Sequence, residues 1–340
     1  MKRTLLTLAL TSALLPAAQG AGRLTIYCSM QNEVCEKAAK RFAEENGVET
    51  RFIRQSTGTI LGKIKSEKDN PQADVWYGGT VEPHLQAADE DLLDLSVTSP
   101  GQADILPQFR KLAEQPHGRH LSLIYLMPFG IGVNTKKLAE LGITPPKCFA
   151  DLKDPQYKHL IQYADPRTTG TGYTTLATLI TLWGEDEAFA YLKALRPNIA
   201  EYVKSGLATK NLATGEVAVD IGFLHNYMHE KEQGAPVEGI LPCEGVGYGL
   251  GAVSVIKGAR NRDNAVKFVD WALSVEAQEL AWRETNYYQL PTNSHAKAPP
   301  QMNPAAELQL IDIDFIDRFG AAKEGKRLTD KWQREVKDGE

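Results

Sequence analysis

Short strand-like runs alternate with helix-like stretches along the first sixty residues that follow the N-terminal segment. β-rich runs stand at 24–27, 48–53 and 73–77, and stretches whose apolar residues have helical spacing separate them. Strand, helix, strand, helix, strand is the order found in a parallel sheet covered by helices. The alternation therefore predicts an α/β fold.

A second α/β unit follows a long apolar segment. The stretch from Leu121 to Val133 is strand-like and suits a strand that crosses between two lobes, and 249–256 would be the return crossing. The pattern predicts further strands and helices at 160–163, about 174–182, 217–223, 264–274, 275–285 and about 305–336. Two lobes that the chain crosses more than once enclose a cleft and a hinge. We expect lobe one at 21–125 plus about 250–290, and lobe two at 126–249 plus about 291–340.

The first residues have the order of a secretory signal peptide. Lys2 and Arg3 precede an apolar stretch, and small residues follow at Ala18 and Gly20. The apolar stretch is about a dozen residues long, short of the ~20 that span a bilayer, so cleavage is favoured over a retained anchor. We expect residues 1–20 to be removed and the mature protein to be periplasmic.

The charge balance limits the class of partner. The net charge is −5, and loss of the two positive charges in the predicted signal peptide makes it −7. An acidic chain argues against nucleic acid as a partner. It does not argue against a small anion, because helix N-termini and backbone amides can bind anions locally.

The four cysteines are an even number in a chain expected to reach an oxidising compartment. We expect the pairs Cys28–Cys35 and Cys148–Cys243, with four buried thiols as the alternative. Seven residues along a helix rise ~10.5 Å, which is too far for a bridge. Cys28 must therefore precede a helix that holds Cys35 in its early turns.

Hydroxyl side chains and glycines gather where predicted strands give way to helices. They are Ser29, Ser56, Thr57 and Thr80 in lobe one, and Thr168, Thr169, Gly170 and Thr171 in lobe two. Ligands of open α/β sheets lie outside the carboxyl ends of strands. The free N–H groups at a helix N-terminus attract anions. These turns are therefore either an anion site or tight turns with ordinary helix caps.

Motifs for catalysis and for nucleotide cofactors are missing from the sequence. It has no G-x-x-x-x-G-K-[ST] loop, no G-x-G-x-x-G opening the first turn, no G-x-S-x-G elbow and no H-E-x-x-H helix. His225 and His229 have a spacing that can ligate a metal, but a third nearby ligand is absent. Glu244 could accept hydrogen bonds from ligand hydroxyls, with a surface ion pair as the alternative. We expect no enzyme activity, no cofactor and no metal site.

Several phrases resemble the bacterial periplasmic solute-binding proteins of the ferric-iron-binding type. They are ADVWYGGT at 73–80, YADP at 163–166 with the following Thr/Gly turn, TGE at 214–216 and PCEGVGY at 242–248. The likeness extends over nearly the whole predicted mature chain. It implies a periplasmic-binding-protein fold (type II-like), in which two α/β lobes joined by crossing strands enclose a cleft. It also implies a monomer that delivers its solute to an ABC permease in the inner membrane.

The iron ligands of that family are not kept. The family uses a His after the first strand, a Glu after the third and a Tyr pair in lobe two, and the matching positions here are Gln31, Gly79, His225 and Asn226. The family's phosphate-holding turn matches Thr169, Gly170 and Thr171. This combination resembles the branch that takes up phosphorylated small molecules, including hexose phosphates and phosphonates. Its hexose-phosphate binders are expected to carry a His-Asp pair and an acidic residue where this chain has His225-Asn226 and Gly249.

The sequence thus predicts a capture protein that closes two lobes around a small, anionic and phosphorylated solute. Lobe two would supply the anion site with Thr168, Thr169, Gly170, Thr171 and Ser205. Lobe one would add Ser29, Ser56, Thr57 and Thr80, while the organic part would meet His225, Asn226 and Glu244. Ferric iron carriage with substituted ligands is the alternative, and a secreted phosphate-ester hydrolase is a more distant one.

Overall fold

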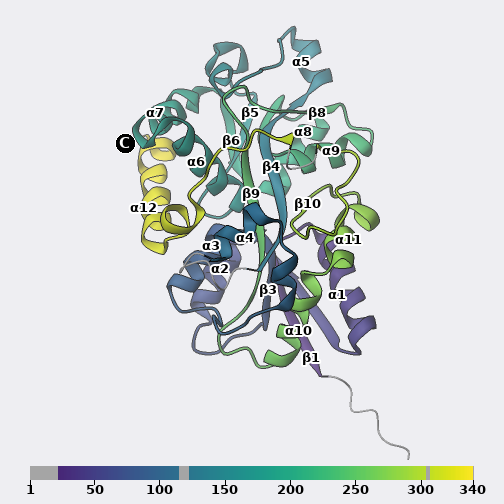
Figure 1. Ribbon diagram of the computed structural model, residues 1–340. Coiled ribbons are helices and arrows are strands. Elements are labelled where there is room, and N and C mark those ends of the chain that lie inside the picture. Colours follow the sequence, from purple (N-terminus) through teal and green to yellow (C-terminus); the bar gives the residue numbers. More distant parts are fainter. Residues whose placement is uncertain (1–21, 115–121, 304–306, 340) are drawn as a thin grey trace, which may run out of the picture.

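The computed structural model describes residues 22–114, 122–303 and 307–339. The chain forms two α/β lobes, one above the other in Figure 1, and one mixed sheet passes through both. The strand order within these residues is β2-β1-β3-β9-β4-β7-β5-β6, and β8 and β10 pair along β4. The predicted α/β fold with two lobes is confirmed. The signal peptide predicted at 1–20 lies outside the described residues.

Lobe one is built on three parallel strands, β1 (Arg23–Cys28), β2 (Glu49–Arg54) and β3 (Val75–Thr80). The first helix, α1 (Asn32–Asn46), buries Val34, Ala38 and Phe42 at helical spacing. It ends at Gly47, whose φ of 66° is a conformation that suits glycine. The remaining helices of this part are α2 (Thr57–Ser66), α3 (Val81–Asp89), α4 (Pro107–Glu114), α10 (Arg262–Ala272) and α11 (Val275–Thr285).

Lobe two is built on β5 (Ile161–Ala164), β6 (Ile199–Val203), β7 (Val219–Phe223) and β8 (Val237–Ile240). Its helices are α5 (Thr135–Leu141), α6 (Gly170–Trp183), α7 (Glu185–Leu195), α8 (Ser205–Thr214) and α9 (Leu224–Glu232). The C-terminal α12 (Ala322–Trp332) runs along the side of this lobe in both figures. It also reaches lobe one, where Gly325 packs against Gln86 of α3.

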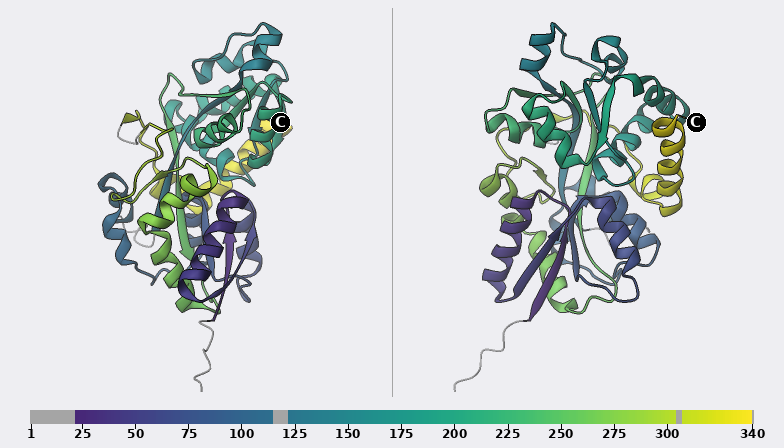
Figure 2. Two further views of the ribbon diagram at one scale, coloured as in Figure 1. Left: turned by 90° about the vertical axis from the view of Figure 1, so that its right-hand side faces the viewer. Right: turned by 180° about the vertical axis from the view of Figure 1, so that it is seen from behind.

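Two long strands join the lobes. β4 (Ser122–Asn134) and β9 (Gly247–Val255) are antiparallel neighbours, and every residue of both is buried. β4 pairs with β10 (Leu290–Pro291) towards lobe one and with β7 and β8 in lobe two. The crossing segments predicted near 121–133 and 249–256 are therefore confirmed. Both strands run from one lobe into the other in Figure 2.

Both predicted disulfides are present. Cys28, the last residue of β1, bonds to Cys35 in α1 with a Cα–Cα distance of 6.1 Å. Cys148 and Cys243 are 95 residues apart in the chain, and their Cα atoms are 4.8 Å apart. The first bridge fixes the turn that carries Ser29, and the second joins two loops of lobe two.

Two predicted helix ranges differ from the structure. The helix expected from about residue 174 begins at Gly170, because Thr169 caps it by accepting a hydrogen bond from the Gly172 N–H. The prediction of a helix from about residue 305 is wrong for residues 307–314. The chain is irregular there, and Leu310 forms an isolated β-bridge with Val246. Helical structure resumes at 315–319. Within the described residues, no helix is both long enough and apolar enough to cross a membrane.

Candidate functional site

A cavity of about 670 Å³ lies between the lobes. Its walls come from the turns that follow β1, β2 and β3 in lobe one, and from those that follow β5, β6 and β7 in lobe two. The volume falls in the usual range for a small-molecule site. It also lies at the carboxyl ends of the parallel strands, where the sequence places the candidate residues.

Six helices begin at this cavity. Cap or first-turn residues of α1, α2, α3, α6, α8 and α9 all line it. The cap residues of α1, α2, α3, α8 and α9 make no side-chain capping bond, and Thr169 alone caps its helix. The first-turn N–H groups of the other five are therefore free of side-chain caps and favour a negatively charged ligand.

The N-termini of α2, α3 and α6 meet around Gly170. A β-carbon at this glycine would lie 2.6 Å from Thr80 Oγ1 and 3.0 Å from Thr57 Oγ1, so no side chain fits there. Thr80 is 2% exposed, and its hydroxyl lies beside the Glu82 carboxyl, to which it donates a weak hydrogen bond. A buried hydroxyl whose protein partner is weak gains from a better bond to a ligand or water. We call this group of Thr57, Thr80 and Gly170 the nest.

The turn before α3 is held in shape from the crossing strand. Gly78 and Gly79 have φ values of 75° and 89°, which L side chains rarely adopt. Tyr125 of β4 accepts a hydrogen bond from the Gly79 N–H at 2.7 Å. A β-carbon at Gly79 would lie 2.5 Å from Thr57 Oγ1, so a side chain has no room at this position.

Direct contacts hold the two lobes together. Ser56 Oγ donates to the Thr168 carbonyl at 2.6 Å, which connects α2 to the turn before α6. Gln31 Nε2 donates to Asn226 Oδ1 at 2.7 Å and lies 3.2 Å from His225 Nε2. The structure is therefore the closed arrangement of the lobes.

His225 is a neutral group in this cleft. It is 1% exposed, and burial lowers the pKa of its imidazole to about 3. Its Nδ1 has no hydrogen-bond partner among the described residues, so it can accept from or donate to a ligand.

The rest of the cleft is mildly positive. The lining holds three cationic side chains, Arg54, Lys204 and Lys210, against the two carboxylates of Glu33 and Glu230. This balance contrasts with the net charge of −5 for the whole chain. An anion therefore meets a locally favourable field on an acidic protein.

Most of the predicted ligand residues meet at the cleft. Those that line it are Ser29, Ser56, Thr57, Thr80, Gly170, Thr171, His225 and Asn226. Thr168 is not among the lining residues, and its carbonyl accepts from Ser56 at the contact between the lobes. Ser205 is the first residue of α8, but its side chain lies outside the described part of the structure.

Two predicted residues have structural roles instead. Thr169 is 1% exposed, and its hydroxyl donates to the Asp165 carbonyl and accepts from the Gly172 N–H. Glu244 does not line the cleft; its carboxylate accepts from the N–H groups of Phe149 and Ala150, at 2.9 and 2.8 Å. Both side chains are occupied as helix caps, so the expectation that they contact the ligand is corrected.

Several lining residues were not predicted from the sequence as ligand contacts. They are Gln31, Arg54, Tyr125, Lys204, Tyr287 and Gln289, among others. Arg54 and Lys204 each follow a strand, and that position could have identified them. Tyr287 and Gln289 follow α11, far from any predicted strand end, and only the tertiary fold brings them to the cleft.

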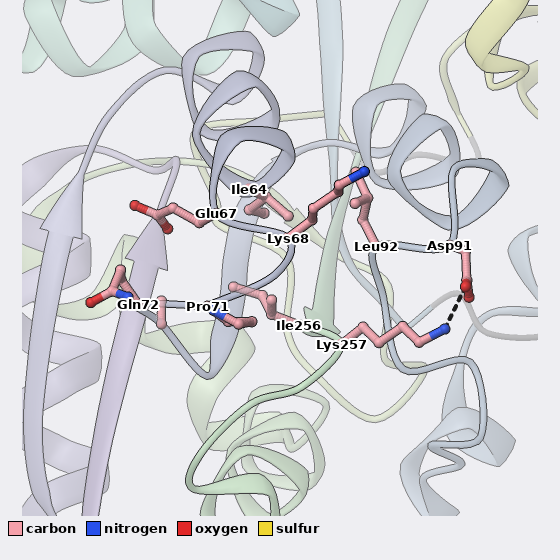
Figure 3. Close-up of a pocket in the computed structure, with 10 residues that line it drawn as sticks. Ile64, Glu67, Lys68, Pro71, Gln72, Asp91, Leu92, Ile256 and Lys257 are labelled. Carbon is pink, nitrogen blue, oxygen red and sulfur yellow. Dashed lines mark hydrogen bonds and ion pairs between the residues drawn. The ribbon is translucent and has the colours of Figure 1, made fainter.

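Smaller hollows lie elsewhere in the described residues, among them one of about 150 Å³ beside α9 that is lined by Leu224, Met228 and Met302. A hollow of about 30 Å³ lies at the C-terminal end of α2. Figure 3 shows its lining residues, with an ion pair that joins Lys257 to Asp91. This volume is too small for an organic ligand. Only Cys148, Cys243 and Glu244 group as candidate metal ligands among these residues, and the two cysteines are already bonded to each other.

Comparison with known proteins identifies the class of protein. Residues 37–309 match the family described as bacterial extracellular solute-binding protein. The chain belongs to this family. The resemblance to periplasmic solute-binding proteins that the sequence predicted is thereby confirmed.

Individual members of the solute-binding family are close in sequence and structure. The periplasmic binding protein P5PA is 54% identical, with a TM-score of 0.90 over 93% of this chain and 99% of that one. AfuA from Actinobacillus pleuropneumoniae, solved with exogenous fructose-6-phosphate bound, is 51% identical with the same TM-score and coverage. An uncharacterized protein of Haemophilus influenzae is 47% identical over 99% of both chains.

Proposed function

We propose that this solute-binding protein captures a small phosphorylated solute in the periplasm and delivers it to an ABC permease. The phosphate would bind at the nest, with Ser56, Thr171 and the amides of α2, α3 and α6 around it. The organic part would extend towards Gln31, His225 and Asn226.

One observation carries the proposal: the nest is completed only when the lobes close. Thr57 and Thr80 come from lobe one and Gly170 from lobe two, and the buried Thr80 hydroxyl lies at their junction. An anion bound here contacts both lobes in the closed state alone, so its binding shifts the equilibrium towards closure. The fructose-6-phosphate bound to AfuA supports a phosphorylated ligand for a chain 51% identical to it.

The organic part would meet a polar wall without a buried carboxylate. Gln31 and Asn226 already share a hydrogen bond, and Gln31 Oε1 has no partner among the described residues. His225 Nδ1 and Gln289 Oε1 are likewise unpartnered there. These atoms favour an organic part that carries hydrogen-bond donors, such as hydroxyl or amino groups.

Ferric iron is a poorer fit to this cleft. Positions 31, 79, 225 and 226 hold Gln, Gly, His and Asn, which include neither a carboxylate nor a phenolate. At Gly79, Thr57 Oγ1 and Ser29 Cβ leave no space for a longer side chain. Ferric iron prefers hard oxygen ligands, and these positions do not supply them.

A thermal-shift panel tests the proposal. Fructose 6-phosphate, glycerol 3-phosphate, an aminoalkylphosphonate, inorganic phosphate, ferric citrate and free fructose would each be added to ligand-free protein. We expect a large increase in Tm with at least one organophosphate and none with fructose. Stabilisation by fructose or by ferric citrate, with no response to any organophosphate, would overturn it.

The same panel addresses hydrolysis. We expect the organophosphate that binds best to be recovered intact after long incubation with purified protein. Release of inorganic phosphate that follows the protein through purification would favour a hydrolase instead.

A further inference from the structure

A buried carboxyl group lies directly behind the nest. Glu82 is the second residue of α3, two positions after Thr80, and is 0% exposed. Its Oε1 accepts from Thr174 Oγ1 at 3.3 Å, and the Thr80 hydroxyl and the Glu82 N–H also donate to the carboxyl. A charged carboxylate in this position would be poorly solvated.

The carboxyl also lies at the contact between the lobes. Glu82 belongs to lobe one, and Thr174 lies one turn into α6 of lobe two. The same two helices begin at the nest, where Gly170 faces Thr80. Glu82 and a phosphate in the nest would therefore share the N-terminal ends of α3 and α6.

The surrounding groups do not neutralise a negative charge on Glu82. Tyr173 of α6 and Tyr248 of β9 are titratable groups near enough for Glu82 to raise the pKa of both phenols, but burial is the larger cause and raises that of Tyr248 to about 12. On α3 itself, His84 contacts the Gly78 carbonyl and the Ser254 hydroxyl. Burial is accordingly the largest influence on Glu82, and it raises the pKa of the carboxyl to about 7.

The cations on neighbouring elements are engaged with other carboxylates. In α2, Lys63 pairs with Glu67 and Lys65 pairs with Glu90. On the C-terminal segment, the charged groups that interact with one another are Arg318, Glu324, Arg327 and Lys331, together with Glu185 of α7. The hydroxyls of Thr80 and Thr174 and the Glu82 N–H donate hydrogen bonds that lower the pKa of the carboxyl, but they are neutral groups and burial outweighs them.

We propose that Glu82 takes up a proton when a phosphorylated ligand binds, which makes capture by this protein proton-coupled. The inference rests on the proposed function and adds the protonation state of the site to it. Two negative groups that share a poorly solvated site disfavour each other's charge. The bound anion therefore favours the neutral carboxylic acid, and by linkage an ionised Glu82 weakens binding of the anion.

The coupling predicts a specific dependence on pH. A phosphate ester has its second pKa near ~6, so between about pH 7 and 9 its charge is constant. His225 is already neutral in that range, since burial lowers the pKa of its imidazole to about 3. Affinity should weaken by up to about tenfold per pH unit over this range, because one proton is linked to binding.

Calorimetry of fructose 6-phosphate binding tests the coupling. Titrations at about pH 8 in buffers of different ionisation enthalpy give the number of protons taken up per ligand. We expect the wild type to take up a large fraction of one proton, and Glu82→Gln to take up almost none and to bind with an affinity independent of pH.

Asp220→Asn is the matched control. Asp220 is a second buried carboxyl whose pKa is raised to about 7 by burial, but it lies on β7 within lobe two and accepts from Tyr227 Oη. This variant should keep the proton uptake of the wild type. Equal loss of uptake in both variants would overturn the assignment to Glu82.

A measurement on the unmodified protein covers the case in which Glu82→Gln does not fold. The infrared difference spectrum of the wild type at about pH 8 should gain a protonated-carboxyl band when fructose 6-phosphate is added. Binding without this band and without proton uptake overturns the coupling alone. Absence of binding by every phosphate ester in the panel would contradict the proposed function instead.

Discussion

Gly58→Ala should weaken ligand binding without destabilising either lobe. Gly58 is the second residue of α2 in lobe one, and a β-carbon there would lie 2.9–3.0 Å from backbone atoms of Arg167 and Thr168 in lobe two. Carbon atoms in contact prefer separations of about 3.5–4.0 Å, and backbone atoms cannot rotate away. The methyl group therefore opposes closure, while the open state has no such contact.

The magnitude follows from the cost of overpacking. An extra methyl in a tightly packed interface costs about 1–3 kcal/mol. If only the closed state bears this cost, the affinity falls by roughly 5- to 150-fold. The free energy of unfolding should be unchanged or up to about 1 kcal/mol higher, because alanine is a better helix former than glycine.

Gly62→Ala is the matched control for this test. Gly62 lies one turn further along α2, and a β-carbon there has no neighbour within 4 Å. Both variants would be titrated calorimetrically with the phosphate ester that most stabilises the wild type, and small-angle scattering would report closure. Gly58→Ala should lose affinity and close incompletely, whereas Gly62→Ala should match the wild type. Equal affinity in the two variants would refute the claim that the ligand-bound state has this interlobe contact.

Three further predictions concern single groups. Thr80→Val should weaken phosphate-ester binding about 10-fold or more in calorimetry and change the free energy of unfolding in urea by no more than about 1 kcal/mol, because the hydroxyl gives up only a weak bond to the Glu82 carboxyl; unchanged affinity would remove Thr80 from the site. The pKa of Glu82 rises from 4.5 to about 7 on folding, so its stabilising contribution is full below pH 4.5 and is lost as pH rises to about 7. Above that pH the free energy of unfolding is about 3 kcal/mol lower than below pH 4.5. In urea unfolding, Glu82→Gln should therefore lose less stability between about pH 5 and pH 8 than the wild type does; an equal loss in the two proteins would contradict this prediction. Replacing Cys148 and Cys243 together by alanine should cost about 4–5 kcal/mol in denaturant unfolding, because the bridge closes a loop of 95 residues; a loss below about 1 kcal/mol would disagree with the chain-entropy account.

Much of the fold could be predicted because it depends on local patterns. The period of the apolar residues identified β1, α1, β2, α2 and β3, and the unusually long apolar runs identified the crossing strands. The pairing of Cys28 with Cys35 could be predicted from their separation of seven residues. Two cysteines seven residues apart in one helix are too distant to bond, so Cys28 has to precede the helix that holds Cys35.

The side chains that line the site were harder to predict, because a polar side chain near a strand end can either face the cleft or bond to the backbone nearby. Thr169 caps α6 and Glu244 caps the short helical segment at 149–153, a role that competes with ligand binding for the same oxygen atoms. Nothing local distinguishes Thr169 from Thr171, which lines the cleft. The distinction depends on which hydroxyl faces the α6 backbone.

Gln31 and Glu82 show a second limit. The partners of Gln31 lie about two hundred positions further along the chain, in Asn226 and His225. Glu82 is of a residue type that is rarely buried, yet it is buried here because α6 of the other lobe packs over it. Contacts between lobes are formed by the tertiary fold, and no local period of the sequence encodes them.

Paired calorimetric titrations test the central claim most directly. Fructose 6-phosphate would be compared with fructose, glycerol 3-phosphate with glycerol, and an aminoalkylphosphonate with the corresponding amino alcohol, all on ligand-free wild-type protein. The account predicts that at least one phosphorylated compound binds and that its unphosphorylated partner does not. Equal binding of both members of a pair, or binding of the neutral member alone, would contradict capture of the solute through its phosphate.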